Sequence, residues 1–161
     1  MIILNKNLSK LIYTIVLVLA LGYLMSCDTM EEETIMTKEE IITVFETNYE
    51  KFDTVQKFIS EGTGEYYFYT HRVANTREIL FKNNAKEVEI KNKKIFRSLL
   101  FIIDDLEFRQ ISEGENDIIF VKDSGSFSQG IMYLESHSMP VFVRESKKIT
   151  DNWWYYNSIV E

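Results

Sequence analysis

Cysteine, proline and histidine are nearly absent from this chain of 161 residues. It contains one cysteine, Cys27, one proline, Pro140, and two histidines, His71 and His137. A single cysteine excludes an internal disulfide and the usual zinc sites, which are built from several thiolates. One proline and six glycines are too few for a linker-rich or disordered chain, so a folded domain is expected.

Basic residues are also scarce. The chain has 18 lysines and arginines against 25 acidic residues, a net charge of −7. Lys6 and Lys10 are the only charged residues in the first 26, so the remainder carries 16 basic and 25 acidic side chains, or −9. An acidic domain repels phosphate backbones and anionic headgroups. We therefore expect no nucleic-acid partner and no membrane adsorption through a basic patch.

The first 26 residues have the layout of an export signal. Lys6 and Lys10 precede the uncharged run LIYTIVLVLALGYLM at positions 11–25. About 20 apolar residues are needed to cross a bilayer, whereas an apolar core of about 15 is typical of a signal peptide. The alternative is an uncleaved membrane helix.

The end of this segment resembles the lipobox of bacterial lipoproteins. Leu24, Met25, Ser26 and Cys27 place a leucine three residues before the cysteine and a small residue directly before it. The resemblance implies that the Cys27 sulfur receives a diacylglycerol group and that a signal peptidase cuts after Ser26. Two or three acyl chains on one residue anchor a protein stably, whereas one chain binds only marginally.

These features predict three parts of the chain. Residues 1–26 are a lipoprotein signal peptide, 27–36 are the lipidated cysteine and an acidic tether, and 37–161 are a single domain. The tether spans about 30 Å at most when extended. The expected location is the cell membrane, with the domain held on its extracytoplasmic side by acylated Cys27.

Two segments carry apolar residues at helical spacing. Thr37 and Glu40 form a capping-box pattern, and the periodic residues that follow predict a helix from about 38 to 60. Gly62 and Gly64 are expected to end it. A second helix is predicted from about 92 to 106.

The rest of the chain favours strands. Residues 65–71 are rich in aromatics, and Asn83-Asn84 within residues 77–90 is compatible with a hairpin turn. The C-terminal part alternates short apolar segments with turn-formers, which predicts an antiparallel meander. Its strands are expected at 108–111, 117–122, 130–135 and 153–158. The predicted class is α+β, with two helices on one face of an antiparallel sheet of about four to six strands.

A second resemblance covers residues 90–156. The stretches KNKKIFRSLLFIIDDLEFRQIS, NDIIFV, SQGIMYL and NWWYY are similar to a group of small bacterial proteins, many of them lipoproteins of low-GC bacteria. The resemblance is one of fold and implies no activity, because the group has no assigned function and function does not follow from fold.

Few residues suggest chemistry. His137 lies near Glu135 and two serines, and His71 ends the aromatic segment, so an envelope hydrolase using either histidine is one hypothesis. Asp104 and Asp105 are adjacent, but neighbours on a helix point about 100° apart and do not share a site. Neither a second thiol nor an H-x-x-x-H pattern is present, so no metal site and no cofactor are expected.

The aromatic segments suggest a binding surface. Alternation along a strand sends Tyr67 and Tyr69 to one face, and likewise Trp154 and Tyr156. If that face is open, these four rings are candidate ligand-binding residues for a protein, peptide or glycan partner. The leading hypothesis is a lipid-anchored, non-enzymatic binding domain of the cell envelope. The alternatives are the envelope hydrolase and an immunity-type protective protein.

Overall fold

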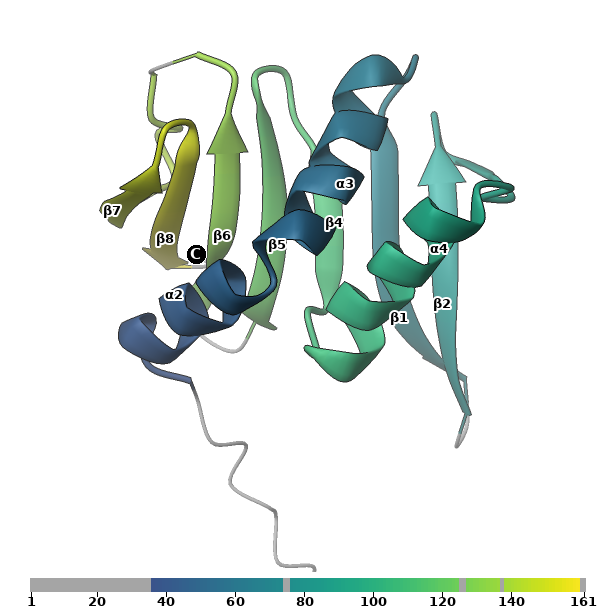
Figure 1. Cartoon of the computed structure of the whole chain (residues 1–161), viewed down its shortest axis with the longest axis horizontal. Helices are drawn as coiled ribbons and strands as arrows, with labels where there is room; N and C mark the ends of the chain where they lie inside the picture. Colours follow the sequence, from purple (N-terminus) through teal and green to yellow (C-terminus); the bar gives the residue numbers. More distant parts are fainter. Residues whose placement is uncertain (1–35, 74–75, 125–126, 137, 160–161) are drawn as a thin grey trace, which may run out of the picture. The chain divides into compact units, whose positions relative to one another are not determined.

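The computed structural model describes the backbone of residues 36–161 except 74–75, 125–126, 137 and 160–161, and side chains within 36–70, 79–122, 128–136 and 138–158. These residues form an α+β fold, as predicted, with helices covering one face of an antiparallel sheet (Figure 1). The expected numbers of elements are too low. The described residues form three α-helices and eight strands, in place of two helices and four to six strands.

The first helical segment is divided at Asn48. α2 (Lys38–Thr47) and α3 (Tyr49–Glu61) replace the single helix expected from 38 to 60. The Asn48 backbone leaves the helical region, with φ −117° and ψ 19°, and its side-chain Nδ2 donates to the carbonyl oxygen of Val44 at 2.9 Å. Such a side-chain bond competes with the regular helical hydrogen bonds, which explains the break.

Capping at the start of α2 follows the sequence pattern. The Thr37 N–H donates to Glu40 Oε2 at 2.7 Å, and the Glu40 N–H donates to Thr37 Oγ1 at 3.3 Å. The Thr37 N–H and the Thr37 hydroxyl both donate to Glu40 Oε2, which favours the charged form of Glu40 and lowers its pKa. At the other end, α3 stops at Gly62, which is extended, and Gly64 has a φ of +105° that favours glycine.

The second predicted helix is confirmed, but its last turn is wider than an α-helix. α4 (Lys93–Leu100) is capped by the Asn92 side chain and continues into η1 (Phe101–Asp105), a π-helical turn. Lys122 Nζ donates to the carbonyl oxygen of Leu106 at 2.6 Å, just past this turn. A cation is favourable there because helix C-termini carry unpaired carbonyls and partial negative charge.

The eight described strands form one sheet in the order β3-β2-β1-β4-β5-β6-β8-β7, and all neighbours are antiparallel. Their bounds are β1 (Tyr66–Val73), β2 (Thr76–Asn83), β3 (Lys86–Glu87), β4 (Gln110–Glu113), β5 (Asp117–Ser124), β6 (Phe127–Leu134), β7 (Glu145–Thr150) and β8 (Trp153–Ile159). The predicted C-terminal antiparallel strands are present, and the hairpin expected at Asn83-Asn84 is found one residue later, with its turn at Asn84-Ala85 and a second strand of only two residues. The sequence did not indicate β7, because this edge strand has almost no buried residue.

The main core lies between the helices and the sheet. The Phe52 ring of α3 is at its centre and is fully buried. Ring centroids of Phe45, Phe108, Phe120 and Trp153 lie 5.2, 5.3, 5.2 and 6.4 Å from it. Edge-to-face arrangements of this kind add to the stabilisation from burial alone.

A smaller apolar cluster lies on the other face of the sheet. Met132, Leu134 and Tyr156 are buried there, and Met139 and Val143 from the β6–β7 connection pack against them. The connection therefore covers part of the face that the helices leave free. No helix in the described residues is long and apolar enough to cross a membrane. Cys27 and the segment before it lie outside the described residues.

Candidate functional site

The helix-free face of the sheet carries two rows of aligned side chains. One row runs Tyr67, Ser112, Ile119, Met132 and Trp154 across β1, β4, β5, β6 and β8. The next row runs Tyr69, Gln110, Val121, Gly130 and Tyr156 across the same strands. The four candidate ligand-binding residues thus share one face and two rows. Each row holds one of them at either end.

The two pairs are far apart across the sheet. Four strand spacings separate β1 from β8, or about 19 Å. Tyr67 is 38% exposed, whereas Tyr156 is 1% exposed beneath the β6–β7 connection. The Tyr156 hydroxyl lies 3.3 Å from Ser128 Oγ, and burial raises the Tyr156 pKa. Trp154 is half-buried, with Lys148 Nζ 5.7 Å from its ring. A ligand on this face can therefore reach the β1 pair directly, but not Tyr156.

The accessible group around β1 is here called the tyrosine platform and comprises Tyr67, Tyr69, Lys82, Gln110 and Ser112. The two tyrosine rings lie 4.9 Å apart between centroids, at an angle of 50°. The Tyr67 hydroxyl donates to Gln110 Oε1 at 2.8 Å, and Gln110 Nε2 donates to Ser112 Oγ at 3.3 Å. These bonds fix the positions of both the Tyr67 ring and the amide.

Lys82 completes the tyrosine platform from β2. Its ammonium donates to the Tyr69 hydroxyl, which raises the Lys82 pKa. Partial burial, together with Tyr69, raises the pKa of Tyr67, so the Tyr67 phenol is neutral near pH 7. The tyrosine platform thus combines two ring faces with hydrogen-bond donors from an amide, a phenol and an ammonium. Such a set suits a polar ligand with apolar patches, and it has no strong nucleophile.

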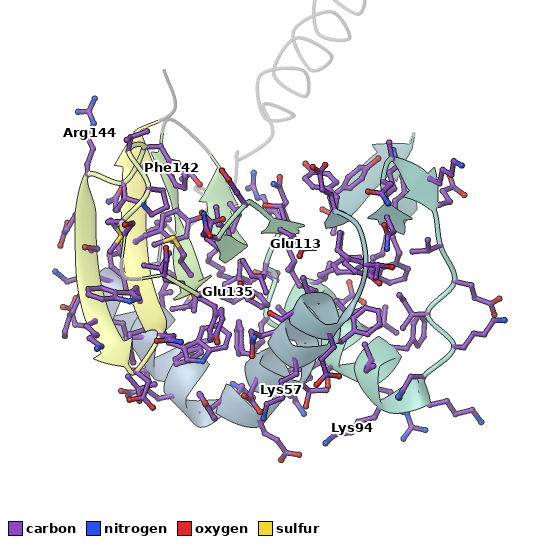
Figure 2. The ribbon with its side chains drawn as sticks, turned by 90° about the horizontal axis from the view of Figure 1, so that it is seen from above. Lys57, Lys94, Glu113, Glu135, Phe142 and Arg144 are labelled. Carbon is purple, nitrogen blue, oxygen red and sulfur yellow. The ribbon has the colours of Figure 1, made fainter. Side chains whose placement is uncertain are left out.

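The sequence did not point to a second polar cluster near β4 and β6. Glu113 Oε2 accepts from the Tyr66 N–H at 3.1 Å, and burial, with smaller effects from Glu135 and Glu65, raises the Glu113 pKa. Glu135 Oε1 accepts from Ser60 Oγ at 3.0 Å. Figure 2 labels both Glu113 and Glu135. Only the fold brings these carboxylates together, because the two residues are 22 positions apart in the chain.

Metal chemistry has no visible support. Within the residues that the structure describes, no group of three or more histidine, cysteine, aspartate or glutamate side chains could hold a metal ion. Asp104 and Asp105 are both exposed in the π-helical turn. The side chains of His71 and His137, on which the hydrolase hypothesis depends, lie outside the described residues.

An open groove of about 540 Å³ lies beside α4. Phe81, Val88, Ile90 and Phe96 form its apolar walls, with Glu87 and Glu89 at its margin. The groove borders β3, a strand that pairs with β2 over only a few residues. The groove has apolar walls but no buried polar group that would orient a ligand, so it is a weaker candidate than the tyrosine platform.

Comparisons with protein-family models, with curated proteins and with solved structures found no match.

Proposed function

We propose that the protein is a lipid-anchored, non-enzymatic binding domain of the cell envelope, which uses the tyrosine platform to bind a glycan chain. Acylated Cys27 holds it in the membrane, with the domain on the extracytoplasmic side. The observation that carries the binding role is that the β6–β7 connection covers the helix-free face around Tyr156, while the part around Tyr67 stays accessible.

A glycan fits the chemistry of this surface. Sugar rings present apolar C–H faces that stack on phenol rings, and hydroxyls that accept or donate hydrogen bonds. Tyr67 and Tyr69 supply the ring faces, while Gln110 and Lys82 supply donors at the edges. The Lys82 ammonium also favours glycans with carboxylate groups over neutral ones.

Binding is tested with soluble glycan strands prepared from bacterial cell walls, by calorimetry on the full-length protein. An aromatic contact contributes about 0.5–1.5 kcal/mol, so Tyr67→Ala is expected to weaken binding roughly two- to tenfold. Tyr49→Ala is the matched control, because Tyr49 is equally exposed, at 42%, but packs on Phe45 and Trp153 on the helix side. Equal affinities of both variants and the wild type would refute the glycan role.

The anchor is tested separately by labelling cells with a fatty-acid analogue. We expect label on the wild-type protein and none on Cys27→Ala. Mass spectrometry of the purified protein should show an acylated N-terminal Cys27. An intact Met1 or a free thiol at Cys27 would contradict the anchor without affecting the glycan assay.

A further inference from the structure

The β6–β7 connection presents an apolar turn to solvent. Val141 is fully exposed and Phe142 is 43% exposed, although most large apolar residues of the described chain are buried. The turn is well defined, because the Val143 N–H donates to the Pro140 carbonyl oxygen at 3.1 Å and Met139 and Val143 are inserted into the apolar cluster. Val141 is thus held outward by an ordered backbone, while the Phe142 ring packs edge-on against Tyr156 at 6.4 Å and keeps part of its surface exposed.

This turn lies at the end of the sheet from which the tether leaves. Met36 is held there, because Gln129 Nε2 donates to its carbonyl oxygen at 2.8 Å. Gln129 is paired with Asn157, whose carbonyl oxygen accepts from the Arg144 N–H at 2.9 Å. Gln129 and Arg144 are therefore about two strand spacings apart, or roughly 10 Å.

A direct ion pair connects the same two parts of the chain. Lys38 Nζ at the start of α2 lies 2.6 Å from Glu145 Oε1 at the start of β7. Figure 2 shows Phe142 and Arg144 on the opposite side of the sheet from Lys57 and Lys94, which mark α3 and α4. The turn thus projects from the side of the sheet that the helices leave free, next to the point of attachment.

The length of the tether keeps this end near the bilayer. Eight residues, 28–35, separate Cys27 from Met36, so the domain end can be no more than about 30 Å from the anchor. Because the tether is short, the turn experiences a high effective concentration of membrane surface. Even a weak attraction between them is then sufficient for contact.

The charges near the turn favour the same contact. Arg144 is exposed directly after the turn, while the carboxylate of Glu145 is already paired with Lys38. Apolar side chains beside a cation are typical of elements that lie in a membrane interface. Residues 27–161 carry a net charge of −9, so the cation beside the turn reduces the repulsion of this end by anionic headgroups.

We propose that Val141 and Phe142 insert into the headgroup region of the lipid bilayer and dock the domain on the membrane by the end that bears the tether. This proposal rests on the anchor proposed for Cys27. Docking fixes the orientation of the domain, which a tether alone does not.

The test uses the full-length protein in liposomes of phosphatidylethanolamine and phosphatidylglycerol. In Val141→Cys, an environment-sensitive fluorophore is attached to the new thiol, since acylation blocks Cys27. Glu115→Cys is the control, because this exposed residue lies in the β4–β5 hairpin at the opposite end of the strands. We expect a blue-shifted emission and quenching by spin-labelled lipids at position 141, and neither at position 115.

The two proposals fail in different ways. Emission at position 141 that matches position 115 would overturn docking while leaving the anchor intact. Reaction of the wild-type protein with the fluorophore at Cys27 would refute the anchor, and docking with it. Phe142→Glu in the labelled protein should reduce the blue shift, and an unchanged shift would also contradict insertion.

Discussion

Gln129 is expected to determine how firmly the start of the domain is held. It is 6% exposed, and its two amide atoms have different partners. Oε1 accepts from the Tyr155 hydroxyl at 3.0 Å, and Nε2 donates to the Met36 carbonyl oxygen at 2.8 Å. Gln129→Leu keeps the approximate volume and removes both bonds, so it isolates their contribution.

The expected loss follows from the burial of each partner. The Tyr155 hydroxyl bond is buried, and a buried group without a partner costs about 1–3 kcal/mol. The Met36 bond is only partly buried, so water can replace some of it and about 0.5–1.5 kcal/mol is lost. Together these give a loss of roughly 1.5–4.5 kcal/mol in the free energy of unfolding. The Asn157 side chain also bonds to Tyr155, which favours the lower part of this range.

Urea denaturation followed by Trp fluorescence measures this loss. Gln56→Leu is the matched control, since Gln56 is also 6% exposed but has one side-chain partner, Ser60, at 2.9 Å. A double-mutant cycle with Tyr155→Phe should give a coupling energy of about 1 kcal/mol. If Gln129→Leu is within about 0.5 kcal/mol of the wild type, the bonds do not hold the start of the domain as argued.

Three further predictions concern single positions. Gly130→Ala should destabilise the fold by about 3 kcal/mol or more in urea denaturation, because a Cβ there would lie 1.9 Å from the Phe120 carbonyl oxygen. Gly114→Ala, whose Cβ would meet only a movable side chain, should cost clearly less, and equal losses would contradict the packing argument. Ala85→Gly should stabilise by about 0.5–1 kcal/mol in thermal unfolding, because Ala85 has a φ of 61°; a destabilised variant would show that the turn is not strained. Burial raises the pKa of Glu113 in the folded state, so stability is lost as pH rises through that pKa. Glu113→Gln should therefore be more stable than the wild type at pH 7, by at most about 1 kcal/mol, and the difference should vanish below pH 4.5, the ordinary pKa of a glutamate; a pH-independent difference would refute this assignment.

Residue periodicity predicted much of the fold, because most of its elements have one buried face. Ile41, Phe45 and Phe52 are buried as the helical spacing requires. The spacing gave no sign of the break at Asn48, since the apolar pattern continues across it. β7 was missed because its residues, ESKKIT, are almost all exposed. Its sequence therefore shows no alternation of buried and exposed positions.

The candidate site shows where such reasoning stops. Strand alternation correctly gives Tyr67 and Trp154 the same face. Their distance depends on the order of the strands, which no local pattern encodes. The cover over Tyr156 depends on the path of the β6–β7 connection. Likewise, Glu113 and Glu135 meet only because β4 and β6 flank β5.

The position of the tyrosine platform restricts the partners that it can meet. Measured along the strands, the row that contains Tyr69 lies one residue from the level of Gln129. The row that contains Tyr67 lies three residues from that level. At about 3.3 Å per residue, the tyrosine platform lies within roughly 10 Å, measured along the strands, of the level of Gln129. Three strand spacings also separate β1 from β6, so the tyrosine platform lies roughly 20 Å from Gln129 and at most about 50 Å from the bilayer when the tether is fully extended. With the turn docked it lies closer. A glycan bound there must therefore come near the membrane surface.

Insertion of a long flexible spacer between Cys27 and Met36 should weaken capture of membrane-attached glycans but leave affinity for soluble ones unchanged, because only the effective concentration changes. Loss of affinity for soluble glycans in that variant would mean that the tether itself takes part in binding.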